Sequence, residues 1–202
     1  MRKILKNRLA LSTVVTTLII LVVSVLLAGV VTYFAINVVS TRVQQQNLTL
    51  SLQHIWVDSA GVSEAGMLIT NTGGRDVVLT AIEIRGIAAT FGADGNVFVA
   101  VDGAGGTIPA SLACLTSTEM ATAADNPFGA TAGAFAKSTG ELILNSGASI
   151  IVYILAPAGV TIQDVGTTIG ITVFTAQAMY YTETNVQVGV TDAVGPPAGV
   201  IG

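Results

Sequence analysis

The stretch LSTVVTTLIILVVSVLLAGVVTYFAINVVST, residues 11–41, decides the fold of this chain. It belongs to a run of 33 residues between Arg8 and Arg42 that contains no charged side chain. A helix crosses the hydrocarbon core of a bilayer with about 20 apolar residues, so the run is long enough to span a membrane. A helix in a soluble core would seldom be apolar on every side over such a length, because one face normally meets water. We therefore predict a membrane-spanning helix.

The basic residues around this run indicate its orientation. Four of them, Arg2, Lys3, Lys6 and Arg8, precede the run, and only Arg42 follows it directly. By the positive-inside rule we expect a cytoplasmic N-terminus and an exported C-terminal part. The run is about twice as long as the 7–15 residues of a secretory signal, and no small-residue cleavage site follows it. We expect the helix to remain in the mature protein.

The composition of the remaining chain fits an exported, weakly charged protein. Charged residues make up 10% of the sequence, against about 25% in ordinary soluble domains. Beyond Arg42 only Arg75, Arg85 and Lys137 face twelve carboxylates, an excess of nine negative charges. Such an acidic surface argues against nucleic acid as a partner. The single cysteine, Cys114, excludes an intramolecular disulfide and a zinc site built from cysteines.

Residues 48–202 read as an extracellular β-rich head. Polar and apolar residues alternate from Leu48 to Trp56, which is the period of a half-buried strand. Further strand-like segments, separated by Gly, Asn and Asp turns, are predicted at residues 67–70, 76–84, 96–101, 141–144, 149–155, 168–175 and about 178–191. Seven or eight short strands of this kind indicate an antiparallel β-sandwich, Ig-like in type. With the preceding helix the predicted fold class is α+β.

Residues 102–140 interrupt this rhythm. Ala, Gly, Ser and Thr dominate the segment, which carries little charge and has no sustained periodicity. A stretch of this length without regular structure tends to be a functional loop or an exposed insertion. We expect a mobile surface insertion with short local structure.

Side chains able to carry chemistry are few. His54 is the only histidine, and we interpret it as a packed or surface residue of a strand rather than a ligand. Without a second histidine, neither a Ser-His-Asp nor a Cys-His arrangement has support, and we interpret Cys114 as a small apolar residue rather than a nucleophile. We expect no enzymatic activity, no bound metal and no cofactor.

Three short motifs have ordinary explanations beside functional ones. Asp94-Gly95-Asn96 fits a hairpin turn as well as the start of a calcium loop. The glycine-rich segment 102–107 lacks the lysine of a phosphate-binding loop and reads as a turn. Asn47-Leu48-Thr49 is an N-glycosylation sequon in the polar collar after the helix.

The helix itself carries a stripe of small residues. At 100° per residue the whole stripe falls within one sector of about 100°. Its members are Thr13, Thr17, Ser24, Ala28, Thr32 and Ala35. Small residues four apart let helices approach closely in a membrane, where lipid offers no hydrophobic drive for association. The stripe predicts packing against other helices, although a Thr-rich segment also produces such a series by chance.

The N-terminal segment resembles a known family. Arg8-Leu9-Ala10 followed by LSTVVTTLIILVV is similar to archaeal type IV pilins, the group that includes archaellins, over about residues 8–46. The resemblance implies a class III signal peptide, cut by a prepilin peptidase on the cytoplasmic side of the membrane. It places the cut between Ala10 and Leu11. The freed helices would then bundle into a filament with the help of a pilus assembly machinery.

Two positions depart from the family pattern. Leu9 stands where the family prefers a charged residue, two places before the cut, and Val15 stands at the fifth mature position, where bacterial pilins carry glutamate. Archaeal relatives often lack this glutamate.

Together these features predict a leader of residues 1–10, a transmembrane and polymerisation helix of about 11–47, and a head of 48–202. The expected function is that of a structural subunit of an extracellular archaeal type IV pilus-like filament, a homopolymer of this chain. The alternatives are an archaellin, the subunit of a motility filament, and a permanently anchored, single-pass extracellular binding module.

Overall fold

The computed structural model describes residues 2–43, 45–102, 107–115, 117–120, 126–129 and 133–189. It divides into two compact units, Met1–Gln45 and Gln46–Gly202. The first unit is a helix and the second is the β-rich head, so the α+β class predicted from the sequence is confirmed.

Helix α1 spans Arg2–Val43 without interruption. It therefore includes most of the predicted leader and ends four residues before the predicted boundary at 47. Within it Leu11–Thr41 is long and apolar enough to cross a membrane, with a mean hydropathy of 2.9. Residues 45–47 have no regular structure, and the first strand begins at Leu48 as the alternation predicted.

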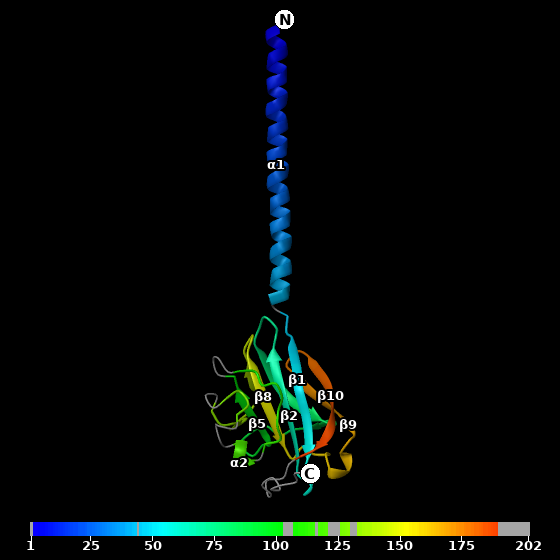
Figure 1. Cartoon of the computed structure of the whole chain (residues 1–202). Helices are drawn as coiled ribbons and strands as arrows, with labels where there is room; N and C mark the ends of the chain where they lie inside the picture. Colours follow the sequence, from blue (N-terminus) through cyan, green and yellow to red (C-terminus); the bar gives the residue numbers. More distant parts are fainter. Residues whose placement is uncertain are drawn as a thin grey trace, which may run out of the picture. The chain divides into compact units, whose positions relative to one another are not determined.

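The head contains ten strands among its described residues (Figure 1). Their bounds are β1 Leu48–Val57, β2 Ser63–Asn71, β3 Val77–Ile84, β4 Ile87–Ala88, β5 Val97–Val101, β6 Ala136–Lys137, β7 Leu142–Leu144, β8 Ser149–Leu155, β9 Thr168–Thr175 and β10 Met179–Val188. A single helical turn, α2, occupies Ser117–Met120, and a 3₁₀ turn, η3, occupies Ile162–Asp164. The predicted strands are present with ends shifted by three residues or fewer, except that β2 begins at Ser63, four residues before its predicted start at Met67. The unpredicted β4 and β6 have two residues each.

The strands follow the order β4-β3-β9-β10-β1-β2-β8-β5-β6, with β7 paired to β3. The sheet is mixed rather than wholly antiparallel, because β1 runs parallel to β10 with Ile55 opposite Val186. Strand β1 pairs with β2 along both its halves, around a register shift between Ser51 and His54. Since β1 and β10 are parallel, the chain enters the head at one end and reaches Val188 at the other.

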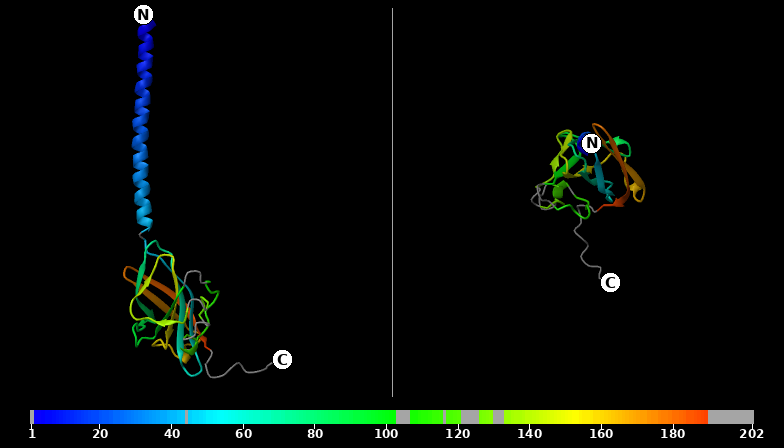
Figure 2. Two further views of the ribbon diagram at one scale, coloured as in Figure 1. Left: turned by 90° about the vertical axis from the view of Figure 1, so that its left-hand side faces the viewer. Right: turned by 90° about the horizontal axis from the view of Figure 1, so that it is seen from above.

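The sheet is strongly curled, so its two halves face each other (Figure 2). The inward side chains of both halves form the main core, to which every strand except β4 and β6 contributes. Met67, Leu79, Ile154 and Ile171 are fully buried there. Alternating strand residues thus supply one core, since successive side chains point to opposite faces of a strand.

A second core covers the outer face of β1, β2, β8 and β5. Trp56, Leu68, Ile151 and Tyr153 of these strands pack against the segment after β5. That segment contributes Leu112, Leu115, Met120, Phe128 and Phe135, all buried. The expectation of an exposed surface insertion at 102–140 is therefore wrong for these residues. Scattered large apolar side chains, rather than a periodic pattern, attach the segment to the sheet.

Gly66 makes the close approach of this second core possible. A Cβ atom at this position would lie 2.8 Å from the ring of Tyr153 and 3.2 Å from that of Trp56. The two rings stack with their centroids 6.3 Å apart, directly over the β2 backbone. Any side chain at this position would push the rings away.

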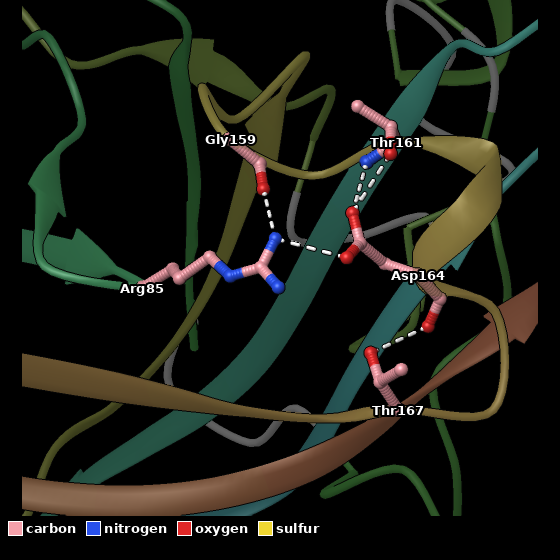
Figure 3. Close-up of polar contacts among 5 residues, drawn as sticks. All are labelled: Arg85, Gly159, Thr161, Asp164 and Thr167. Carbon is pink, nitrogen blue, oxygen red and sulfur yellow. Dashed lines mark hydrogen bonds and ion pairs between the residues drawn. The ribbon is translucent and has the colours of Figure 1, made fainter.

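At one end of the head, a polar cluster holds the loop before β9 (Figure 3). The Arg85 guanidinium lies 2.9 Å from Asp164 and donates a hydrogen bond to the Gly159 carbonyl at 2.7 Å. The second carboxylate oxygen of Asp164 accepts bonds from the backbone N–H and the hydroxyl of Thr161. These bonds lower the pKa of Asp164, with the backbone N–H of Thr161 as the largest cause. The cluster ties the β3–β4 turn to the 3₁₀ turn.

Candidate functional site: the surface of the apolar helix

The apolar side chains of α1 are its main unexplained feature. None of the most apolar window within Leu11–Thr41 is buried in the structure. Soluble monomers rarely expose a contiguous apolar surface of this extent, and such a surface marks an interaction with lipid or protein. The outer surface of this helix is therefore the candidate functional site of the chain.

The predicted cleavage residues lie within this helix. Ala10 and Leu11 are consecutive residues of α1, and Leu11 is the first residue of the span that could cross a membrane. Their processing stays a prediction.

The predicted stripe of small residues lies on a continuous helix. All six of its residues belong to α1, and all are exposed. Because α1 is helical from Arg2 to Val43, the 100° step places these residues on one face. Bulky side chains, mainly Leu, Ile and Val, occupy most of the remaining surface, and Leu21, Val31 and Val39 share this sector. The face is therefore narrow mainly around the small residues themselves.

Hydroxyl groups on the helix bond to the helix itself. Ser24 donates to the carbonyl of Ile20 at 2.6 Å, and Thr32 donates to that of Ala28 at 2.8 Å. Thr17 donates in the same way to the carbonyl of Val14, three residues earlier. Placing a polar group in hydrocarbon without a hydrogen-bond partner raises the free energy by roughly several kcal/mol. These three hydroxyls need no partner from outside, so they are compatible with either lipid or a second helix.

Asn47 of the glycosylation sequon is exposed just before β1. Its side-chain amide donates a hydrogen bond to the hydroxyl of Thr72 at 2.8 Å. The backbone carbonyl of Asn47 accepts hydrogen bonds from the backbone N–H groups of Thr72 and Gly73. The sequon is thus anchored to the β2–β3 turn, with its side chain at the surface.

His54 is packed, as predicted. Its ring is half-buried and stacks on Trp56 with centroids 5.2 Å apart and an interplanar angle of 20°. Within the described part of the chain, no group of three His, Cys, Asp or Glu side chains is arranged to hold a metal ion.

Cys114 takes part in a cluster that the sequence did not indicate. Its Sγ donates to the carboxylate of Glu64 at 3.0 Å, and the backbone N–H of Leu115 donates to the same carboxylate at 3.1 Å. Glu64 is only 5% exposed, and burial is the main cause that raises its pKa to about 7. The only sequence signal for this cluster was an acidic residue, Glu64, within the run from Ser63 to Asn71. It was missed because the strand predicted from the sequence began only at Met67.

The Asp94-Gly95-Asn96 motif is a turn. The Asn96 side chain accepts a bond from the backbone N–H of Thr90 and donates one to the carbonyl of Leu155. Its backbone N–H donates to the Thr90 carbonyl at 3.0 Å. These bonds favour the turn interpretation over a calcium loop, because the asparagine already serves the backbone. Of the glycine-rich segment 102–107, residues 103–106 lie outside the described residues.

No family model matches the chain, and a sequence comparison with curated proteins finds no match either.

Proposed function

We propose that this chain is the structural subunit of an extracellular archaeal type IV pilus-like filament. In this proposal a prepilin peptidase removes residues 1–10, and the α1 helices of many copies then pack together. The observation that carries the proposal is the fully exposed apolar surface of Leu11–Thr41, joined to a head that has its own closed core.

The small-residue face supports helix packing over simple anchoring. In a bilayer a helix is accommodated when it is apolar, whatever the size of its side chains. In a bundle of identical helices the backbones must approach, and Ser24, Ala28 and Thr32 keep one side of the helix narrow. Both an adhesive pilin and an archaellin would use the helix in this way.

The precursor would sit in the cell membrane with its N-terminus cytoplasmic, as the basic residues before the apolar run indicate. The mature protein would lie in a cell-surface filament, and the sequon at Asn47 would make it a glycoprotein. For the head we propose a β-sandwich of Ig-like type, with β1 shared by its two layers. The inward side chains from both halves of the curled sheet support this arrangement.

The second candidate is a permanently anchored, single-pass extracellular binding module. The hydrogen bonds that Ser24 and Thr32 donate within α1 are compatible with this candidate as well. Because both hydroxyls already have a partner, they can face lipid without leaving a polar group unpaired. The two candidates differ in processing, since an anchor needs no cut between Ala10 and Leu11.

Processing can be tested on filaments sheared from cells that produce this chain. We expect an intact mass and an N-terminal sequence that begin at Leu11, with the four basic residues of the leader removed. Filaments whose subunits retain Met1, or a cut beyond Val39, would exclude the class III signal. Cells that express the chain but form no filament containing it would favour the anchored module.

A further inference from the structure

Glu64 is a buried acid without a counter-ion. It lies on β2 between Trp56 of β1 and Leu155 of β8, on the face covered by the second core. Among the described residues, which include every Lys and Arg beyond Arg42, it makes no ion pair. A charge buried in this way is costly, because neither water nor an opposite charge compensates it.

The three cations of the head are placed elsewhere. Arg85 pairs with Asp164. Lys137 donates to the carbonyl of Ala93 and lies over the ring of Phe98. Arg75 is exposed in the turn between β2 and β3. No rearrangement of a nearby lysine or arginine is therefore at hand to neutralise Glu64.

The partners of Glu64 all belong to the segment after β5 that covers the outer face of the sheet. We call this segment the cover; its buried residues are Leu112, Leu115, Met120, Phe128 and Phe135. The backbone N–H of Leu115 donates to both carboxylate oxygens, at 3.3 and 3.1 Å, and Cys114 Sγ donates at 3.0 Å. Beside them Tyr153 Oη of β8 donates to the Ala113 carbonyl at 2.8 Å. Three consecutive residues of the cover are thus tied to two neighbouring strands of the sheet.

We propose that Glu64 is a charge-controlled clasp. With residues 112–115 closed over it the Glu64 carboxyl is buried without a counter-ion, so closure favours the protonated form and ionisation favours lifting of the segment from the sheet. Lifting the segment brings water to the carboxylate, which removes the cost of burying a lone charge. The clasp is a property of the head and does not depend on whether the chain forms filaments.

The groups around Glu64 determine the direction of the response. Cys114 and Leu115 donate to the carboxylate and favour its charged form, whereas burial and the charge of Glu119 favour the neutral form. Burial is the largest of these causes, and the pKa of Glu64 is raised from 4.5 to about 7. Tyr153 of β8 also faces the carboxyl, and its own pKa is raised by burial and by Glu64. On β1 the facing residue is Trp56, on which His54 stacks.

The pH window follows from the two pKa values of Glu64. In the lifted state the carboxyl is solvated and returns to its ordinary pKa, whereas in the closed state the pKa is about 7. The opening equilibrium therefore grows by up to about tenfold per pH unit between these two values and levels off above the higher one. The cover is held most tightly in acid.

Amide hydrogen exchange of the full chain in detergent micelles tests the clasp. After correction for intrinsic exchange rates, the protection of a peptide spanning residues 107–115 should fall by up to about tenfold per pH unit between pH 4.5 and 7. A peptide from β8 should keep its protection over the same range. In Glu64→Gln the protection of the 107–115 peptide should be the same at every pH.

Two matched variants separate the clasp from its neighbours. Tyr153→Phe removes the bond to Ala113 without touching a charge in this range, so it should raise exchange equally at every pH and keep the slope. His54→Gln removes the imidazole that stacks on Trp56, the residue opposite Glu64 on β1, and should also keep the slope.

Three results would overturn the clasp: protection of the 107–115 peptide independent of pH in the natural protein, a slope that persists in Glu64→Gln, or a slope that disappears in His54→Gln. If Glu64→Gln loses protection in β8 as well, that variant has not folded. The natural protein then decides, because loss of protection in β8 together with the cover would mean general unfolding rather than a clasp.

Discussion

The helix and the head use the same apolar residues in opposite ways. Leu27 of α1 is 64% exposed, whereas Leu79 of β3 is fully buried. In the helix the apolar residues follow one another without a break, so they surround its axis. In the strands they alternate with polar residues and collect on one face. The pattern, rather than the amount of apolar sequence, decides which region closes a core by itself.

The comparison between helix and head shows which of the two needs a partner outside its own unit. The head satisfies its apolar side chains within Gln46–Gly202, even on an outer sheet face, through the cover after β5. The helix has no such cover in its own unit. Substitutions in the helix should therefore affect membrane insertion or assembly, and substitutions in the head should affect its folding. The following predictions test that division.

The largest effect is expected for Ala28→Phe. If helices pack through the small-residue face, a large ring at its centre should allow normal insertion and cleavage but leave few or no filaments, because backbones can no longer approach. Electron microscopy of cells that produce the variant measures the outcome. Leu26→Phe, on the opposite side of the helix, adds the same ring as a control and should do less harm. Abundant normal filaments with Ala28→Phe would mean that this face is not an assembly surface.

A core substitution should act on the head alone. Ile154 is fully buried in the main core, and Ile154→Ala should lower the free energy of unfolding of the head by about 2–5 kcal/mol through lost contacts and a cavity. Denaturant unfolding, followed by the fluorescence of Trp56, reports on the head because this is the only tryptophan. Leu27→Ala, in the exposed helix, should leave that transition unchanged. A matching loss in Leu27→Ala would contradict the separation of the two regions.

A smaller effect is expected at the surface cluster of the head. The pKa of Asp164 is lowered in the folded protein, so its stabilising contribution is present above its ordinary pKa of 3.8 and is lost as the pH falls through the folded value. Asp164→Asn should remove this part of the acid sensitivity, measured as the change of melting temperature between neutral and acidic pH. Arg85→Gln should remove it only in part, because the Thr161 bonds remain. Equal effects of both variants would make the ion pair the dominant contact instead.

The smallest effect is expected for Thr32→Val. The Thr32 hydroxyl bonds to the carbonyl of Ala28 in its own helix, so its removal leaves no partner from another chain unpaired. The valine side chain keeps a similar size, and insertion and filament number should both be unchanged. Filaments lost in Thr32→Val but retained in a Thr32→Ser control would show that the hydroxyl serves a neighbouring helix.

Much of the fold could be predicted from local pattern. The unbroken apolar run predicted the helix, and period-two alternation predicted β1 from its first residue, Leu48. Turn residues placed the ends of β3, β8 and β9 within about a residue. These signals work because the spacing of apolar residues along the chain determines which face of a helix or strand they occupy. The parallel pairing of β1 and β10 was not predictable in this way, since residues 55 and 186 are far apart in sequence.

The cover and its clasp were also missed. Leu112, Leu115 and Phe128 lie among Ala, Gly and Thr without a period, so their sequence resembles that of a loop. Their burial depends on a sheet face whose shape arises from Gly66, Trp56 and other strands. The buried position of Glu64 has the same origin, because its strand and its cover are separated by about fifty residues.

By itself the sequence determined that this chain has one long apolar helix, a weakly charged acidic head and strands in a definite order. Each of these follows from neighbours along the chain, through hydrophobic spacing and turn chemistry. Only the tertiary structure decided that the sheet is mixed and curled and that part of the apparent insertion belongs to a second core. It also decided that Glu64 is buried beneath this part of the chain. Those features depend on contacts between distant segments, because burial is a property of what lies opposite a side chain and not of the residues beside it.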